Sequence, residues 1–224
     1  MSVLSVIIPA YNEAATIEKV IQEIQNLPIH KEIIVVDDAS TDGTGELLKK
    51  MGGSIVVVTH DTNRGKGAAV RSGFGRATGR AVIVQDADLE LYPGDIPRLL
   101  EKMEETKCGL VIGSRILEFN EKRTMNYYGN IFLTWIANVL FGLDLTDIMS
   151  GYKLLDARIV PELAVESDSF NIEPEIVAKV RNLKEEICEV PVRYDPRRYM
   201  EGKKIRKWHG FGVLYTLFKY RFFH

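Results

Sequence analysis

Three carboxylates stand at alternate positions in the short segment DADLE, residues 86 to 90. They belong to Asp86, Asp88 and Glu90, and they follow AVIV (81 to 84), a run of strand-forming residues that is expected to be buried. Like charges this close repel one another, so a positive partner is expected nearby. Because alternate residues of an extended segment point the same way, these side chains can share one hard cation, Mg²⁺ or Mn²⁺, and that metal can bridge to a diphosphate. A lone D-x-D pair is common in solvated loops, so the elements around it decide its meaning.

The segments around DADLE alternate between strand and helix patterns. Apolar runs predict strands at 2–9, 32–38, 54–60, 81–88 and 109–115, and helical spacing predicts helices at 17–27, 41–51, 65–77 and 95–106. This alternation predicts an α/β fold with a Rossmann-like, mostly parallel sheet and helices on both faces. Ligands bind such sheets outside the carboxyl ends of the strands. Four of these ends carry polar residues, at 11–13, 37–38, 86–90 and 114–115.

The second half of the chain is less regular. It shows a mainly apolar helical pattern at 127–142, an amphipathic helical pattern at 171–183 and a strand-like alternation at 185–194. No repeat, low-complexity tract or linker-like stretch divides the sequence. We therefore predict a single domain over 1–224, in which 116–224 completes a site that 1–115 begins.

Composition excludes several classes of function. The chain of 224 residues has a formal charge of −2, so no overall field favours nucleic acid as a partner, although nine Lys or Arg residues crowd the segment from Arg193 onward. No signal peptide opens the sequence, and the longest apolar run (131–143) is shorter than the roughly 20 residues that span a bilayer. We expect a protein that is soluble or lies on a membrane surface. Cys108 and Cys188 show no CxxC spacing and are expected to be buried free thiols, with a disulfide or a metal role as the alternative.

The strand ends also narrow the choice of nucleotide. An acid at the end of the second strand, here Asp38, is what a dinucleotide-binding fold uses to grip ribose. That fold needs G-x-G-x-x-G after its first strand, where this chain has PAYNEAAT (9–16), and the later GKG (65–67) has Val70 in place of a third glycine. There is no P-loop either, so a dehydrogenase or a P-loop ATPase is disfavoured. A sugar nucleotide remains, with ribose and base at the first two strand ends and its diphosphate on a metal at the fourth.

Several ordered motifs resemble a known family. PAYNEAATI, VVDDASTDGT, NRGKGAAVRSGF, QDADLE and GSR are similar to the family 2 glycosyltransferases of the GT-A fold. DIMSGYKLL, FNIEPEIVAKV and EVPVRYDPRRYMEGKKI resemble the branch that contains the dolichyl-phosphate mannose and glucose synthases and their bacterial polyprenyl-phosphate relatives. The resemblance extends from Val3 to about Lys207. It is specific for the fold and the family and much less so for the sugar.

The resemblance implies a nucleotide-sugar pocket built at the strand ends. The residues expected to bind the nucleotide are Pro9, Tyr11, Glu13, Val36, Asp38 and Lys66, with Asp86, Ala87 and Asp88 at the diphosphate. The expected metal contacts are Asp86, Asp88 and Glu90, and Glu90 stands where family members often carry Gln. Lys66 has an alternative interpretation as a solvated lysine in a tight glycine turn.

The resemblance also implies the acceptor side of the site. Arg115 matches the arginine expected near the acceptor phosphate, and Arg123 is a second candidate. A basic loop with Arg198, Lys203 and Lys204 is expected to close over the phosphates, with Arg198 and Lys203 also reaching the nucleotide. Asp147 is the one candidate for a base, and holding the SGYK turn is its alternative role. The expected catalytic set is Asp88, Arg115, Asp147, Arg198 and Lys204.

These features lead to one functional hypothesis and three alternatives. We expect an inverting, metal-dependent transfer of a hexose from GDP-mannose or UDP-glucose to a polyprenyl or dolichyl phosphate, at the cytoplasmic face of a membrane. A lipid phosphate is already ionised near neutral pH, so it needs cations rather than a base. The alternatives are a family 2 enzyme with a non-lipid acceptor, a nucleotide-sugar-binding subunit of a membrane complex, and a nucleotidyltransferase, which usually opens with a glycine-rich loop that this chain lacks.

Overall fold

The computed structural model of the protein describes residues 3–117, 125–196 and 209–223. Within them, seven strands form one sheet in the order β3-β2-β1-β4-β6-β5-β7. The strands are β1 (Leu4–Ala10), β2 (Lys31–Asp37), β3 (Val56–Thr59), β4 (Ala81–Val84), β5 (Leu110–Ser114), β6 (Lys153–Asp156) and β7 (Ile187–Pro191). Neighbouring strands are parallel except where β6 pairs with β4 and β5. The expected α/β fold with a mostly parallel sheet is therefore confirmed.

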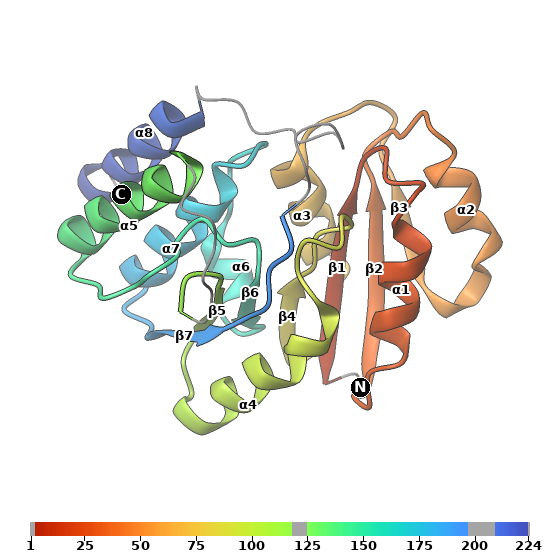
Figure 1. The fold of residues 1–224 in the computed structure, drawn as a ribbon, viewed down its shortest axis with the longest axis horizontal. Helices are drawn as coiled ribbons and strands as arrows, with labels where there is room; N and C mark the ends of the chain where they lie inside the picture. Colours follow the sequence, from red (N-terminus) through yellow and green to blue (C-terminus); the bar gives the residue numbers. More distant parts are fainter. Residues whose placement is uncertain (1–2, 118–124, 197–208, 224) are drawn as a thin grey trace.

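Helices cover both faces of this sheet (Figure 1). They are α1 (Ile17–Gln25), α2 (Thr44–Lys50), α3 (Lys66–Phe74), α4 (Ile96–Thr106), α5 (Met125–Phe141), α6 (Val160–Leu163), α7 (Ile172–Asn182) and α8 (His209–Phe222), with short 3-10 turns at Gly52–Ser54 and Pro93–Asp95. Alternate strand residues point into different cores. Ile33 and Val35 pack with α1 and α4, whereas Ile34 and Val36 pack with α3. A second core joins α5, α7 and α8 to the other half of the sheet.

Strand β6 lies outside every strand predicted from the sequence. It is only four residues long, KLLD, and it begins with a lysine, so its letters show no strand pattern. Lys153 nevertheless pairs with Val84 of β4 and Ile112 of β5, and its side chain is fully buried. Because β6 runs against its neighbours, its first residue lies at the edge where the parallel strands end.

The two cysteines correct another expectation. Cys108 and Cys188 are not free thiols but are joined by a disulfide, and their Cα atoms are 6.2 Å apart. Cys108 lies just before β5, and Cys188 lies in β7, the parallel neighbour of β5. The sheet therefore brings together two residues that are 80 positions apart, which no spacing in the sequence indicates.

Two helices carry most of the exposed apolar surface. α5 spans 17 residues and α8 spans 14, and they pack side by side with α7 against the second core. Across the described segments, no helix combines the length and apolarity required to cross a membrane.

Candidate active site

The parallel strands end at one edge of the sheet, the upper edge in Figure 1. Two interlocked loops follow β1 and β2 there. Asn12 lies in the left-handed region at φ 56°, and its side-chain oxygen accepts a hydrogen bond from the Thr41 backbone N–H at 2.8 Å. The Glu13 N–H donates to Thr44 Oγ1 at 3.0 Å, and Asp42 accepts a bond from the Ala14 N–H at 3.0 Å. These bonds explain why the motifs PAYNEAAT and VVDDASTDGT occur together.

The expected nucleotide residues lie along these loops at different depths. Pro9 is the penultimate residue of β1, and Tyr11 and Glu13 follow in the first loop, where Glu13 is largely buried. Val36 lies inside β2, and its fully buried side chain packs with Ile34 in the core beneath α3. A contact from Val36 to a base therefore has to come from its backbone.

Asp38 is a buried hub rather than an open carboxylate. One oxygen contacts His60 Nδ1 at 2.6 Å and accepts the Arg64 N–H at 2.9 Å, and the other accepts the Gly65 N–H at 2.7 Å. His60 Nε2 in turn contacts Ser72 Oγ of α3 at 2.8 Å. The chain Asp38–His60–Ser72 thus fixes the turn that starts α3. No pattern in the sequence indicates this role for His60.

The segment DADLE is a turn and not an extended strand, which corrects the expectation drawn from its alternation. β4 ends at Val84, and Leu89 lies in the left-handed region at φ 62°. The Asp88 carboxylate accepts the Glu90 N–H at 3.1 Å, a local bond that favours a turn over a strand. Glu90 also accepts a hydrogen bond from the Tyr194 hydroxyl at 3.0 Å. The buried side chain of Ala87 anchors the turn in the first core.

The SGYK motif (150–153) contacts the DADLE turn and holds it in place. Tyr152 is fully buried, and its hydroxyl donates to Gln85 Oε1 at 2.6 Å. The Gln85 amide then donates to the backbone carbonyls of Asp86 and Leu91, each at 3.1 Å. Gly151 packs directly against Asp86, and a methyl group at this glycine would overlap Asp86 Oδ2. The motif therefore positions the carboxylates that follow β4.

Lys66 is not a solvated loop lysine. It is the first residue of α3, and its ammonium lies 2.7 Å from Asp86 Oδ1 and 2.9 Å from Glu173 Oε1 of α7. Glu173 Oε2 lies 2.8 Å from the Lys153 ammonium, so four charges alternate in sign from Asp86 to Lys153. Burial alone would lower the pKa of Lys66, but the carboxylates of Asp86 and Glu173 outweigh it and raise that pKa above its usual range. Burial alone would raise the pKa of Glu173, and the two lysines bring it below its ordinary value.

Arg115 and Asp147 form a second charged pair at the end of β5. The fully buried Asp147 carboxylate accepts hydrogen bonds from Arg115 Nε at 2.7 Å, Arg115 Nη2 at 2.9 Å and Asn130 Nδ2 at 2.7 Å. The guanidinium also lies 5.1 Å from the centre of the Tyr194 ring. Burial by itself raises the pKa of Asp147, yet Arg115 and Asn130 hold it below its ordinary value. Such a carboxylate keeps a proton poorly and is a weak base.

The carboxylates of DADLE are of the right chemical type for a metal, but they do not converge on one point in this structure. Asp86, Asp88 and Glu90 offer the oxygen ligands that Mg²⁺ and Mn²⁺ prefer. Among the described residues, however, no three acidic, His or Cys side chains converge into a cluster, because each of these carboxylates is engaged by the chain itself. Asp86 in particular forms an ion pair with the Lys66 ammonium.

The remaining acceptor residues fall outside the described part of the chain. They are Arg123, Arg198, Lys203 and Lys204.

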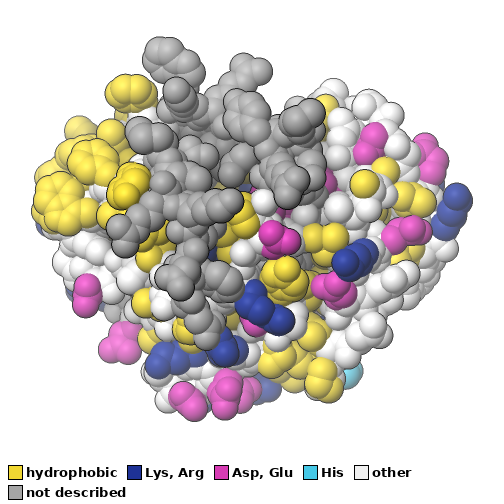
Figure 2. Space-filling view, viewed as in Figure 1, with side chains coloured by type: hydrophobic (Ala, Val, Ile, Leu, Met, Phe, Trp, Pro, Cys, Tyr) yellow, Lys and Arg dark blue, Asp and Glu magenta, His cyan; other side chains and the backbone are white. Residues whose placement is uncertain are grey.

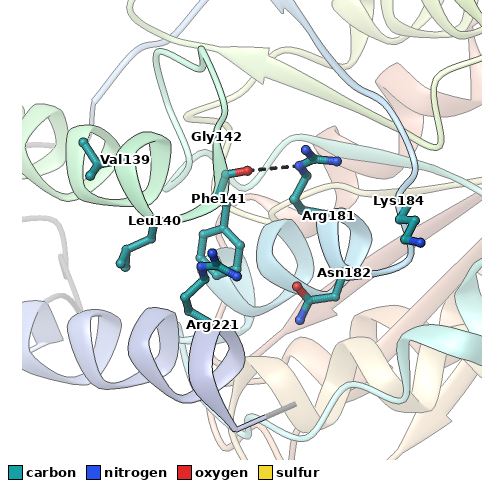
Figure 3. Close-up of a pocket in the computed structure, with 8 residues that line it drawn as sticks. All are labelled: Val139, Leu140, Phe141, Gly142, Arg181, Asn182, Lys184 and Arg221. Atoms are coloured by element: carbon teal, nitrogen blue, oxygen red, sulfur yellow. Dashed lines mark hydrogen bonds between the residues drawn. The ribbon is translucent and has the colours of Figure 1, made fainter.

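A hollow of about 520 Å³ opens away from the sheet edge, between the C-terminal ends of α5, α7 and α8 (Figure 3). There Arg181 donates to the Phe141 carbonyl at 3.0 Å, and Asn182 donates to the Tyr220 carbonyl. Its polar groups close helix ends, so we place the chemistry at the sheet edge.

Comparison of the sequence with protein families gives a match over most of the chain. A model described as glycosyl transferase family 2 matches residues 5–169. The undecaprenyl-phosphate mannosyltransferase of Micrococcus luteus is 31% identical over 213 residues, which cover 88% of this chain and 85% of that protein. The dolichol-phosphate mannosyltransferase of Pyrococcus furiosus is 31% identical over 210 residues, 89% of this chain and 58% of that protein. The UDP-N-acetylglucosamine–dolichyl-phosphate N-acetylglucosaminyltransferase of Methanococcus voltae is 28% identical over 236 residues, 94% of this chain and 93% of that protein.

Comparison of the structure confirms the expected GT-A fold. The chain is similar to glucosyl-3-phosphoglycerate synthase from Mycobacterium tuberculosis in complex with Mn²⁺, UDP and glucosyl-3-phosphoglycerate, with a TM-score of 0.73 and 22% identity. The match covers 98% of this chain and 80% of the other. The same enzyme in complex with Mg²⁺ and UDP also gives a TM-score of 0.73.

Proposed function

The chain belongs to glycosyl transferase family 2, and from this premise we propose that it transfers a hexose from GDP-mannose or UDP-glucose to a polyprenyl or dolichyl phosphate, with inversion at the sugar. The names of the sequence relatives support this acceptor, since two of those described above are mannosyltransferases that act on polyprenyl or dolichol phosphate. The structural relative supports a nucleotide diphosphate and a divalent metal on the same fold.

The donor is proposed to bind across the ends of β1, β2 and β4. Pro9, Tyr11 and Glu13 lie at the first of these ends, and Asp38 lies at the second. Asp86 and Asp88, with Glu90 beside them, would hold Mg²⁺ or Mn²⁺, which when bound supplies positive charge to the leaving diphosphate. Tyr152 and Gln85 keep the turn that carries these carboxylates in place.

The observation that carries the acceptor class is the Arg115–Asp147 pair. A hydroxyl acceptor has to lose a proton, which calls for a base, whereas a phosphate monoester is already ionised near neutral pH. The buried Asp147 carboxylate is bound by Arg115 and Asn130 and is a weak base. The same bonds fix the guanidinium at the end of β5, where it offers charge to an anionic acceptor. The site thus suits an acceptor that arrives as an anion.

The reaction then needs no proton transfer. An oxygen of the acceptor phosphate attacks the anomeric carbon, the bond from that carbon to the donor's diphosphate oxygen breaks, and the nucleoside diphosphate leaves with the electron pair. The work of the chain is to bring two anions together and to neutralise them. Arg115 is proposed for this task, and Arg198, Lys203 and Lys204 are proposed for it from the sequence.

A contact with the membrane surface is part of the proposal. Figure 2 shows apolar side chains gathered over α5 and α8. The exposed members are Tyr128, Ile131, Phe132, Trp135 and Val139 of α5, and Phe211, Tyr215, Phe218, Phe222 and the following Phe223 on the side of α8. An exposed apolar patch of this kind on a soluble domain marks an interaction surface, and aromatic residues favour the membrane interface. Tyr220 is not part of this patch, because it is buried with its hydroxyl on Glu175.

Transfer of labelled sugar tests the proposal. Purified protein with Mn²⁺ and a short-chain polyprenyl phosphate would be offered radiolabelled GDP-mannose, UDP-glucose and UDP-N-acetylglucosamine in parallel. We expect label to reach the lipid from one donor, and Asp88→Ala to abolish it. Asp61→Ala, at an exposed position on the loop after β3, is the matched control and should retain transfer. Transfer that survives Asp88→Ala would contradict the proposed metal site.

A further inference from the structure

Four charged side chains, Lys153, Glu173, Lys66 and Asp86, form a series of ion pairs that runs from the interior to the sheet edge. Lys153 is fully buried, and its ammonium donates to the carbonyls of Ile148 and Ser150 and to Glu173 Oε2. These three bonds use all three of its N–H groups. Glu173 is thereby fixed on α7, and its other oxygen, Oε1, faces the Lys66 ammonium at 2.9 Å.

Lys66 links this interior pair to the proposed metal site. Its ammonium bridges Glu173 Oε1 and Asp86 Oδ1, and the side chain is 13% exposed. Asp86 has little freedom to turn away, because its other oxygen packs against Gly151. A divalent cation that binds Asp86 would thus meet a positive charge on the same carboxylate, and two cations on one carboxylate repel each other.

We propose that Lys66 is an internal counter-cation that competes with the divalent metal for Asp86, and that Glu173, fixed by Lys153, holds the ammonium at the site when the metal displaces it. This inference rests on the proposed function, since the displaced ammonium gains a new acceptor only from a bound nucleoside diphosphate. In this scheme Lys66 contacts the nucleotide, and Glu173 is a positioning residue that acts through Lys66.

Two consequences follow for binding. Metal alone binds weakly, because it has to take Asp86 from Lys66 and leaves one ammonium donor without its acceptor. A nucleoside diphosphate bound with the metal offers that donor an oxygen, so metal and nucleotide strengthen each other's binding. The Lys66 ammonium also offsets the repulsion between Asp86 and Asp88 before the ligands bind.

Titration of Mn²⁺ followed by electron paramagnetic resonance measures this competition without any turnover. The comparison uses the wild type, Lys66→Met, Glu173→Gln and the control Lys179→Met, each with and without UDP or GDP. Lys179 is a matched lysine, because it is 11% exposed and pairs with Glu175 at 3.1 Å and Glu166 at 3.5 Å, away from DADLE.

The two network variants should move the metal affinity in opposite directions. Without nucleotide, Lys66→Met should tighten Mn²⁺ binding by about tenfold, since a repelling charge is removed. Glu173→Gln should weaken it, because the ammonium then has Asp86 as its only carboxylate partner in this network. Lys66→Met should also lose most of the gain in Mn²⁺ affinity that a nucleoside diphosphate gives the wild type, and Lys179→Met should behave as the wild type does.

The outcomes separate this inference from the proposed function. Unchanged or weaker Mn²⁺ binding by Lys66→Met, with Lys179→Met as its baseline, would overturn the competition. If neither UDP nor GDP binds the wild type in the presence of Mn²⁺, the proposed function fails while the titrations without nucleotide still decide the competition. Circular dichroism would verify the fold of each variant, and Lys66→Gln, which keeps a hydrogen-bonding group, would take the place of Lys66→Met if the latter does not fold.

Discussion

Replacing Arg115 with methionine removes a cation that contacts the fully buried carboxylate of Asp147. Asp147 is 0% exposed, and the guanidinium supplies two of its hydrogen bonds, at 2.7 Å and 2.9 Å. The variant keeps the bond from its own backbone N–H and the bond from Asn130. Methionine is unbranched, flexible and uncharged, so it replaces the apolar stem of the arginine while the ion pair is lost.

The expected cost follows from the burial of the partner that stays behind. Removing one member of a buried pair costs about 3–5 kcal/mol, because the other charge is left in the interior. Arg115 is 19% exposed, so solvent screens part of its interaction and the lower end applies. A loss of about 3 kcal/mol is a large share of the roughly 5–15 kcal/mol that stabilises a typical domain. It corresponds to a fall in melting temperature of about 6–12 °C for a chain of this size.

Urea unfolding at pH 7 measures this loss. The double variant Arg115→Met with Asp147→Asn removes the stranded charge and should recover most of the stability. Arg158→Met is the control, since Arg158 is 69% exposed and its pair with Asp156 lies at the surface. A loss for Arg115→Met no larger than that for Arg158→Met, or no recovery in the double variant, would refute the reasoning.

Three further predictions concern pH, the glycine turn and the membrane. The pKa of Asp147 is lowered in the folded state, so the stability it contributes is present above its unfolded pKa of about 3.9 and is lost as pH falls through the folded pKa. Urea midpoints between about pH 5 and 2 should therefore fall less steeply in Arg115→Met than in the wild type. Gly151→Ala should weaken metal and nucleotide binding in calorimetry, because its methyl group overlaps the Asp86 carboxylate, and unchanged affinity would contradict that contact. Trp135→Ser should lower co-sedimentation with anionic liposomes, whereas Val57→Ser, at an exposed apolar position on β3, should leave it unchanged; equal binding by both would exclude the α5–α8 patch.

The central parallel strands β1, β2 and β4 were predictable because they are largely buried on both faces and read as continuous apolar runs. β1 and β2 were placed within two residues of their observed ends for this reason. β6 was not, because four residues beginning with a buried lysine carry no such signal. Lys153 belongs in the interior only through its bonds to Glu173 and two carbonyls, which are tertiary contacts.

The candidate site was predictable in its location more than in its connections. The acidic segment after β4 was expected at the sheet edge. The prediction that this segment is extended was wrong, because the chain turns at Leu89, which has a positive φ. The bridge of Lys66 between Asp86 and Glu173 joins three elements, and no local pattern shows it. The sequence places Glu173 in the first turn of the predicted helix at 171–183. Only the structure shows that Ile172 to Ala178 are all buried, and a buried carboxylate calls for a cation.

A choice between two acceptors tests the central claim most directly. The sequence relatives are named for polyprenyl or dolichyl phosphates, and the structural relative is named for phosphoglycerate. The protein, Mn²⁺ and the labelled donor it accepts would be given polyprenyl phosphate and 3-phosphoglycerate in the same reaction, and the label would be partitioned between organic and aqueous phases. We predict label in the lipid fraction as a glycosyl phosphate, lost in Asp88→Ala. Label found only in aqueous phosphoglycerate product would contradict the lipid-phosphate acceptor.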